Sequence, residues 1–188
     1  TSFLPDILCD YGMADVAYRL FTQTTYPGFG YQILSHNATT TREQWDVIKT
    51  GKEMETYDHA MFSGADKTFY TRFGGIQPLT PGYKTIQIRP CLPDGLNYVR
   101  SSVRTVRGQV TSDWDRSGEV YKHSVTIPVN TTAIIYIPGT DSKKVYENGV
   151  KVSGSKSIRF LRNEDGYLVY EIGSGNYNFT YGAPVTPE

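Results

Sequence analysis

The chain has 188 residues, enough for one large domain or two small ones with a buried core. Lys plus Arg and Asp plus Glu are balanced at 19 each, which excludes the strongly basic surface of a protein that binds nucleic acid or an anionic membrane. No apolar run in the sequence approaches the roughly 18 residues that a membrane-spanning helix needs.

The N-terminal third carries helical patterns. Residues 4–11 have apolar side chains at helical spacing, with Gly12 as the C-terminal cap. Residues 13–23 predict a second helix, which Tyr26-Pro27-Gly28 ends because proline cannot continue the hydrogen-bond ladder. The following segment predicts an extended conformation over residues 29–34.

A long polar segment follows at residues 35–57 and predicts irregular structure, which in compact folds usually means a lid, a binding loop or disorder. The helical period returns over residues 58–73, with Asp58 as the N-cap and His59 in the first turn. One stripe of this predicted helix is apolar and consists of Phe62, Ala65, Phe69 and Phe73. If the stripe packs inward, His59 lies at the rim of a helical core.

The period changes to two after Pro78 and Pro81-Gly82, which predicts a domain boundary near residue 79. About eight short strands separated by turn residues predict an antiparallel β-sandwich, with Trp114 and Val103 or Val110 in its interior. The predicted strands are residues 85–89, 101–106, 110–114, 120–127, 133–137, 158–161, 168–172 and 177–181, with Val145, Val150 and Val152 between the fifth and the sixth. Residues 182–188 resemble a tail.

We expect no metal site and no cofactor. Cys9 and Cys91 are the only two cysteines, and two such residues cannot form a zinc site alone. A disulfide between them and two buried free thiols both fit the sequence, and free thiols are the favoured interpretation. Asn37, Asn130 and Asn178 each begin an N-glycosylation pattern, which in a eukaryotic source suggests secretion. We expect an extracytoplasmic protein, secreted or periplasmic.

The candidate catalytic and substrate-binding residues lie in two segments, Ala38-Thr39-Thr40-Thr41-Arg42-Glu43-Gln44-Trp45 and Asp58-His59-Ala60-Met61-Phe62. A carboxylate, an indole and a histidine so close in sequence could position a water against a neutral, hydroxyl-rich substrate, with Glu43 as the base. The spacing alone favours a plainer interpretation, in which Glu43 caps or decorates a helix and His59 is a satisfied structural histidine.

A resemblance to a known family favours the functional interpretation of Glu43 and His59 over the structural one. The motifs that carry it are Tyr26-Pro27-Gly28-Phe29-Gly30-Tyr31, then Ala38-Thr39-Thr40 with Glu43 and Trp45, then His59-Ala60-Met61-Phe62, Gly75-Ile76, and Pro81-Gly82-Tyr83-Lys84-Thr85-Ile86-Gln87-Ile88-Arg89-Pro90. In this order they resemble the end of the catalytic barrel of the inverting α-L-rhamnosidases, glycoside hydrolase family 78, and its crossing into a C-terminal β domain. Essentially the whole chain is covered.

The resemblance implies an α+β fold in two parts. Residues 1–78 would be the C-terminal helices of an (α/α)6 barrel, and residues 79–188 an antiparallel β-sandwich. Glu43 matches the general base, His59 a substrate-contacting histidine, and Trp45 an aromatic residue that shapes the sugar pocket. The implied partners are a rhamnose-containing oligosaccharide, polysaccharide or glycoside and the remainder of a parent polypeptide.

Nothing in the sequence matches the upstream acidic motif that supplies the general acid in this family. The chain would therefore carry at most half of the catalytic pair, and we expect no α-L-rhamnosidase activity from it alone. It begins at Thr1, inside what looks like a larger helical pattern, which predicts a fragment, a processed product or a truncated chain. The remaining nearby carboxylates are interpreted as loop and cap residues: Asp46, Glu53, Glu55 and Asp58.

The sequence also departs from the family pattern. Arg42 replaces an aromatic residue, Ala60 a tyrosine and Thr68 a tryptophan, and the segment between Glu43 and His59 is short. A pocket with fewer aromatics could prefer a differently linked rhamnoside or a different sugar. The alternative hypothesis is a non-catalytic carbohydrate-binding or structural β-sandwich module. A nucleotide-binding function is excluded, because no glycine cluster follows a strand and opens a helix.

Overall fold

A computed structural model describes residues 2–45 and 56–184, and divides into two compact units. Residues 1–69 and 92–96 form the helical unit, and residues 70–91 and 97–188 form the sandwich unit. The predicted boundary near residue 79 stays a prediction. Among the described residues, no helix is long and apolar enough to span a membrane.

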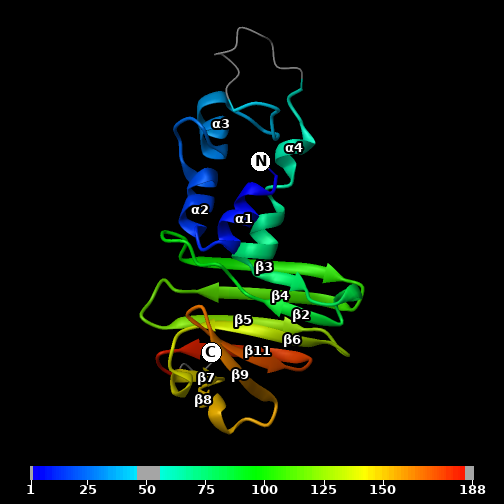
Figure 1. Cartoon of the computed structure of the whole chain (residues 1–188), viewed down its shortest axis with the longest axis vertical. Helices are drawn as coiled ribbons and strands as arrows, with labels where there is room; N and C mark the ends of the chain where they lie inside the picture. Colours follow the sequence, from blue (N-terminus) through cyan, green and yellow to red (C-terminus); the bar gives the residue numbers. More distant parts are fainter. Residues whose placement is uncertain (1, 46–55, 185–188) are drawn as a thin grey trace. The chain divides into compact units, whose positions relative to one another are not determined.

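In its described part, the helical unit contains α1 (Leu4–Asp10), α2 (Ala14–Thr22), α3 (Phe29–His36) and α4 (Ala60–Ser63) (Figure 1). The predictions for the first two helices are confirmed. Gly12 follows α1 with a φ of +75°, a conformation that glycine adopts without strain. Asp6 of α1 is buried and accepts hydrogen bonds from Lys67 Nζ at 2.9 Å and Thr68 Oγ1 at 2.7 Å.

The prediction that residues 29–34 are extended is wrong, because they form most of α3. Apolar residues at positions 29, 31 and 33 imitate the period of a strand. The helix is stabilised instead by Phe29, which stacks on Phe21 of α2, and by Gln32, which is buried and donates from Nε2 to the carbonyl of Gln44 at 2.6 Å. Ile33 and Leu34 remain exposed.

The single helix predicted over residues 58–73 is also wrong in part. The N-cap is His59 rather than Asp58, so His59 precedes the first turn of α4 instead of lying in it. α4 ends at Ser63, and a separate π-helix, η1 (Phe69–Phe73), spans the boundary between the units. In the apolar stripe, Phe62, Ala65 and Phe73 are buried as predicted, whereas Phe69 is exposed.

The sandwich unit consists of two sheets, as predicted, with eleven strands among its described residues. The five-stranded sheet has the order β1 (Ile76–Pro78), β2 (Thr85–Ile88), β6 (Thr132–Pro138), β10 (Tyr167–Ile172) and β9 (Ile158–Glu164). The six-stranded sheet has the order β3 (Tyr98–Thr105), β4 (Gly108–Asp115), β5 (Tyr121–Ile127), β11 (Gly175–Tyr181), β7 (Val145–Glu147) and β8 (Val150–Lys151). All pairs are antiparallel except β2 with β6.

The core of the sandwich unit is formed by alternate residues of both sheets. Trp114 and Val110 of β4 are fully buried, as predicted, whereas Val103 of β3 is half-buried. The indole Nε1 of Trp114 donates to the carbonyl of Phe73 at 2.7 Å, so this large ring has its polar atom satisfied. Because side chains alternate along a strand, the residues between these core positions point outward.

The core also contains a chain of three polar side chains. His123 of β5 is only 1% exposed, and its Nε2 lies 2.9 Å from Ser112 Oγ while its Nδ1 lies 3.1 Å from the Tyr121 hydroxyl. Burial lowers the pKa of His123 to about 3 and raises the pKa of Tyr121 well above its usual value. His123 is therefore a neutral structural residue at physiological pH.

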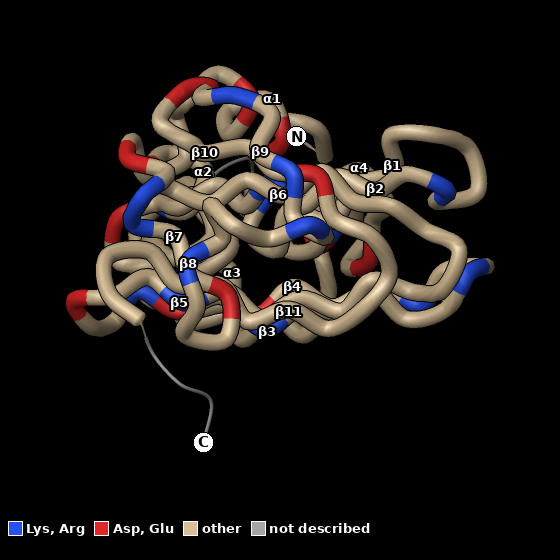
Figure 2. Tube along the Cα trace, turned by 90° about the horizontal axis from the view of Figure 1, so that it is seen from below, with Lys and Arg blue, Asp and Glu red and all other residues tan. Residues whose placement is uncertain are grey.

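Charged residues of both signs are interspersed along the described part of the chain, as Figure 2 shows. This agrees with the balance of 19 basic and 19 acidic residues in the sequence. Cys9 of α1 belongs to the helical unit and Cys91, after β2, to the sandwich unit, and both are half-buried.

Candidate functional site

The three predicted site residues lie on or beside one loop of the helical unit. We call residues 37–45 and 56–59 the base loop; its two arms connect α3 to the gap in the described chain and the gap to α4. Backbone hydrogen bonds join the arms, from His59 N to Thr41 O at 2.7 Å and from Glu43 N to Thr56 O at 3.4 Å. The arm that carries Glu43 therefore lies beside the arm that ends in His59.

Glu43 is half-buried and is held by the opposite arm. Its Oε2 accepts a hydrogen bond from the backbone N–H of Thr56 at 3.2 Å. A carboxylate fixed through one oxygen keeps acceptor capacity on both oxygens, because each has two lone pairs. Such a group can hold and deprotonate a water if one is delivered to it.

His59 has one ring nitrogen fixed by the helix that it caps. Its Nδ1 accepts from the backbone N–H of Met61 at 3.0 Å, as a capping side chain does at the start of α4. An accepting Nδ1 means that the neutral ring carries its proton on Nε2. The ring therefore offers an N–H donor on the side away from α4.

Trp45 is half-buried in an aromatic cluster. Its ring meets Phe62 of α4 at 4.6 Å between centroids and Phe29 of α3 at 5.0 Å, both edge to face. Phe29 in turn stacks on Phe21 of α2 at 5.2 Å. Edge-to-face aromatic pairs are favourable beyond their buried area, so this cluster anchors the base loop to three helices.

Two of the three substituted positions, Arg42 and Thr68, make structural contacts of their own. Arg42 donates from Nη2 to the carbonyl of His36 at 2.8 Å and places its guanidinium over the ring of Tyr57. Thr68 is fully buried against Asp6, and Ala60 is exposed at the start of α4. Arg42 therefore stabilises the same loop that carries Glu43.

Four further carboxylates close in sequence to the candidate site are interpreted as loop and cap residues. Asp58 is exposed, and Asp46, Glu53 and Glu55 lie outside the described residues. Within the described ranges, no group of three or more His, Cys, Asp or Glu side chains could hold a metal ion.

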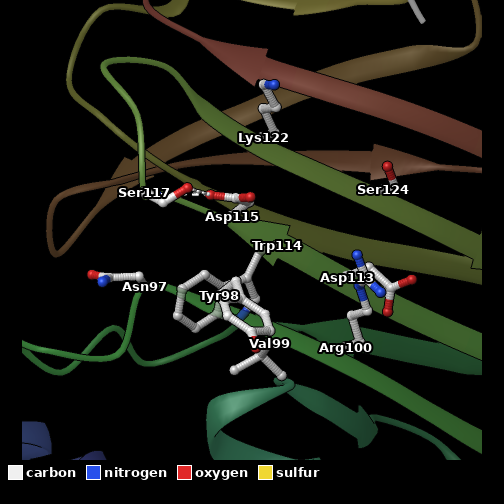
Figure 3. A pocket seen from close by; sticks show the side chains of 10 residues that line it. All are labelled: Asn97, Tyr98, Val99, Arg100, Asp113, Trp114, Asp115, Ser117, Lys122 and Ser124. Carbon is white, nitrogen blue, oxygen red and sulfur yellow. Dashed lines mark hydrogen bonds between the residues drawn. The ribbon is translucent and has the colours of Figure 1, made fainter. Parts of the chain in front are cut away.

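The sequence interpretation missed a concave surface on the sandwich unit. It lies on the six-stranded sheet, is open to solvent, has a volume of about 810 Å³ and is lined largely by polar residues of β3, β4 and β5 (Figure 3). The detectable signal was the polar half of the period-two pattern, with Asp113 and Asp115 on β4 and Lys122 and Ser124 on β5. The alternating pattern identifies each strand by its buried half and does not show what the exposed half lines.

Family models match most of the chain. The model of the bacterial α-L-rhamnosidase six-hairpin glycosidase domain matches residues 1–73, and that of the bacterial α-L-rhamnosidase C-terminal domain matches residues 75–151. Among curated relatives, the α-L-rhamnosidase of Streptomyces avermitilis is 32% identical over 186 residues, which is 96% of this chain and 17% of that protein. An α-L-rhamnosidase of Formosa agariphila is 29% identical over 184 residues, which is 95% of this chain and 20% of that protein.

Solved structures of α-L-rhamnosidases are also similar to this chain. The crystal structure of Streptomyces avermitilis α-L-rhamnosidase complexed with L-rhamnose matches with a TM-score of 0.83 and 31% identity, over 97% of this chain and 17% of that one. The α-L-rhamnosidase from Dictyoglumus thermophilum matches with a TM-score of 0.83 and 30% identity, over 96% of this chain and 20% of that one. The chain spans about a fifth of the length of these relatives. It therefore belongs to the bacterial α-L-rhamnosidase family and joins a part of the six-hairpin glycosidase domain to the C-terminal domain.

Proposed function

We propose that this chain is part of a glycoside hydrolase that cleaves terminal α-L-rhamnosides with inversion, and that it supplies the general base, Glu43. The observation that carries the proposal is the fixed carboxylate of Glu43, on a loop whose other arm ends in His59. Membership of the α-L-rhamnosidase family supports the substrate class.

In an inverting glycosidase the base and the acid stand roughly 6.5–9.5 Å apart, and a water attacks the anomeric carbon from the side of the base. Glu43 would take a proton from that water as the bond to the sugar forms. The acid, from a part of the parent protein outside this chain, would protonate the leaving oxygen. Nε2–H of His59 would donate to a sugar hydroxyl.

Trp45 would present an apolar wall. L-Rhamnose is a 6-deoxy sugar, so it carries a methyl group and an apolar ring face that an indole can contact. The contacts of Trp45 with Phe29 and Phe62 would hold that wall in a fixed orientation. Binding of a rigid ring then costs little side-chain entropy.

The helical unit also suggests where the rest of the catalytic domain packs. Apolar side chains of α1, α2 and α3 are exposed, among them Ile7, Val16 and Ile33. A helix with apolar residues on more than one face is typical of a helix packed on several sides. We propose that the remaining helices of the six-hairpin domain cover these residues.

The experiment compares two proteins on an aryl α-L-rhamnoside. The longer polypeptide that carries this chain should hydrolyse it, and proton NMR of the first product should show the β anomer, as inversion requires. The 188-residue chain alone should show no turnover above background. Retention of configuration would contradict the mechanism, and robust turnover by the 188-residue chain would contradict the assignment of the acid to another part of the protein.

An extracytoplasmic location, secreted or periplasmic, stays a prediction of the proposal. It is checked by fractionating cells that produce the longer polypeptide and assaying each fraction.

A further inference from the structure

The outer face of the six-stranded sheet carries two rows of polar side chains. Strand register places Tyr98 opposite Asp115 and Asp115 opposite Lys122. The next row, two residues along, pairs Arg100 with Asp113 and Asp113 with Ser124. Side chains two residues apart on a strand share a face, so all six of these residues point to the same side of the sheet. We call the concavity that they line the sheet groove.

The sheet groove is large enough for a ligand. Its volume of about 810 Å³ falls within the roughly 300–1,000 Å³ of small-molecule sites. Every residue that lines it belongs to the sandwich unit. Figure 3 shows Arg100 and Asp113 beside each other on neighbouring strands, with Lys122 and Ser124 farther across the sheet.

The two carboxylates in the sheet groove are fixed before any ligand arrives. Oδ1 of Asp115 accepts from the backbone N–H of Ser117 at 2.7 Å and from its hydroxyl at 2.5 Å. These hydrogen bonds, with the charges of Lys122 and Arg100, lower the pKa of Asp115 below its usual value. Oδ1 of Asp113 accepts from the backbone N–H of Ser101 at 3.1 Å. Anchored acceptors lose little entropy when they bind a hydroxyl.

Charge and shape together select the class of ligand. Two carboxylates and two cations give the sheet groove no net charge, which disfavours a free anion and a free metal cation alike. Acceptors next to donors on adjacent strands suit hydroxyl groups, which both donate and accept. Tyr98 is 62% exposed on the same face, and its ring can stack on the apolar face of a sugar.

We infer that the sheet groove is a binding site for a neutral saccharide, separate from the base loop. Tyr98 would be the stacking platform, and Asp113 and Arg100 would hold adjacent hydroxyls. The inference goes beyond the proposed hydrolase function, since the site contains no group that needs to act as acid or base. It gives the C-terminal domain a role in holding a carbohydrate chain.

The test is a titration of the isotope-labelled 188-residue chain followed by amide NMR. The three ligands are methyl α-L-rhamnoside, methyl β-D-glucoside and sodium D-glucuronate. We expect at least one neutral glycoside to shift amides of β3, β4 and β5, while glucuronate does not. Tyr98→Ala should weaken this binding about 10-fold, and Tyr98→Phe should bind within about 2-fold, because the ring is kept.

Two control variants show whether the binding belongs to the sheet groove. Tyr11→Ala removes a 78% exposed aromatic side chain from the helical unit and should leave the titration unchanged. Glu43→Gln should leave the shifts of the β3, β4 and β5 amides unchanged, so a failure of the hydrolase proposal would not affect this binding. Absence of shifts in β3–β5 with both neutral glycosides, shifts with glucuronate alone, or unchanged affinity in Tyr98→Ala would each overturn the inference.

Discussion

The helical unit and the sandwich unit differ in how much apolar surface each buries. Apart from proline, the buried apolar side chains of the described helical unit are Ala17, Phe62 and Ala65, whereas those of the sandwich unit extend through both of its sheets. In the helical unit Phe3, Ile7 and other apolar side chains are exposed instead. The sandwich thus encloses its own core, whereas the described helices leave many of their apolar side chains exposed.

The candidate base and the larger hydrophobic core lie in different units of the chain. The candidate base lies on a loop of the unit that buries least, and that loop is held by a few backbone hydrogen bonds and one aromatic cluster. Segments with few buried apolar contacts open at low free energy. We therefore expect substitutions in the sandwich core to cost more stability in this chain than substitutions in the helical unit.

Trp114→Ala should have the largest effect. It removes a ring that is 2% exposed and the hydrogen bond to the carbonyl of Phe73, so the free energy of unfolding of the sandwich should fall by about 3–5 kcal/mol. Urea denaturation followed by far-ultraviolet circular dichroism measures it. The matched control is Val106→Ala, at an 88% exposed position, which should change the value by less than about 0.5 kcal/mol. If Trp114→Ala and Val106→Ala lowered the free energy of unfolding equally, the conclusion that the sandwich encloses its own core would be contradicted.

Acid should weaken the sandwich through His123. Its folded-state pKa of about 3 is lower than the unfolded value, so its stabilising contribution is complete above about pH 6.5 and is lost as the pH falls toward 3. Between pH 6.5 and 5 the loss should be about 2 kcal/mol, at about 1.4 kcal/mol per pH unit. Urea midpoints at four pH values, compared with those of His123→Gln, isolate this residue. Parallel pH profiles in the two proteins would show that His123 does not titrate on unfolding.

The smallest effect is expected in the helical unit. Lys67→Ala removes an ion pair with Asp6, but the lysine side chain is 56% exposed and solvent screens the interaction. The free energy of unfolding, measured by thermal unfolding at the helical circular dichroism signal, should change by less than about 1 kcal/mol. A loss as large as that of Trp114→Ala would contradict the contrast between the units.

The sequence predicts the sandwich better than the helical unit for a physical reason. Alternation and turn residues identify strands such as β5 and β10, since one face of each sheet must be buried. The sequence does not reveal α3, because the buried side chain of this helix is Gln32, a polar residue, while Ile33 and Leu34 are exposed. No apolar pattern can report a helix of this kind.

The membership of the candidate site stays a prediction, and its contacts could not be predicted from the sequence. Glu43, Trp45 and His59 stand out through motif order, and spacing alone would have favoured structural roles for them. His59, rather than the predicted Asp58, is the N-cap of α4. Its role depends on the hydrogen bond that its Nδ1 accepts from the backbone N–H of Met61, which no sequence pattern shows. The sheet groove depends on strand register, which brings together residues distant in sequence.

The most direct test of Glu43 as the general base measures kcat of the longer polypeptide with Glu43→Gln, on an aryl α-L-rhamnoside. Glutamine keeps the size and the contact with Thr56 but removes the basicity, so kcat should fall by roughly 100-fold or more. His59→Ala should act mainly on KM, and Glu119→Gln, the same chemical change at an exposed position between β4 and β5, should leave both constants unchanged. Near-normal kcat in Glu43→Gln would contradict the assignment of Glu43 as the general base.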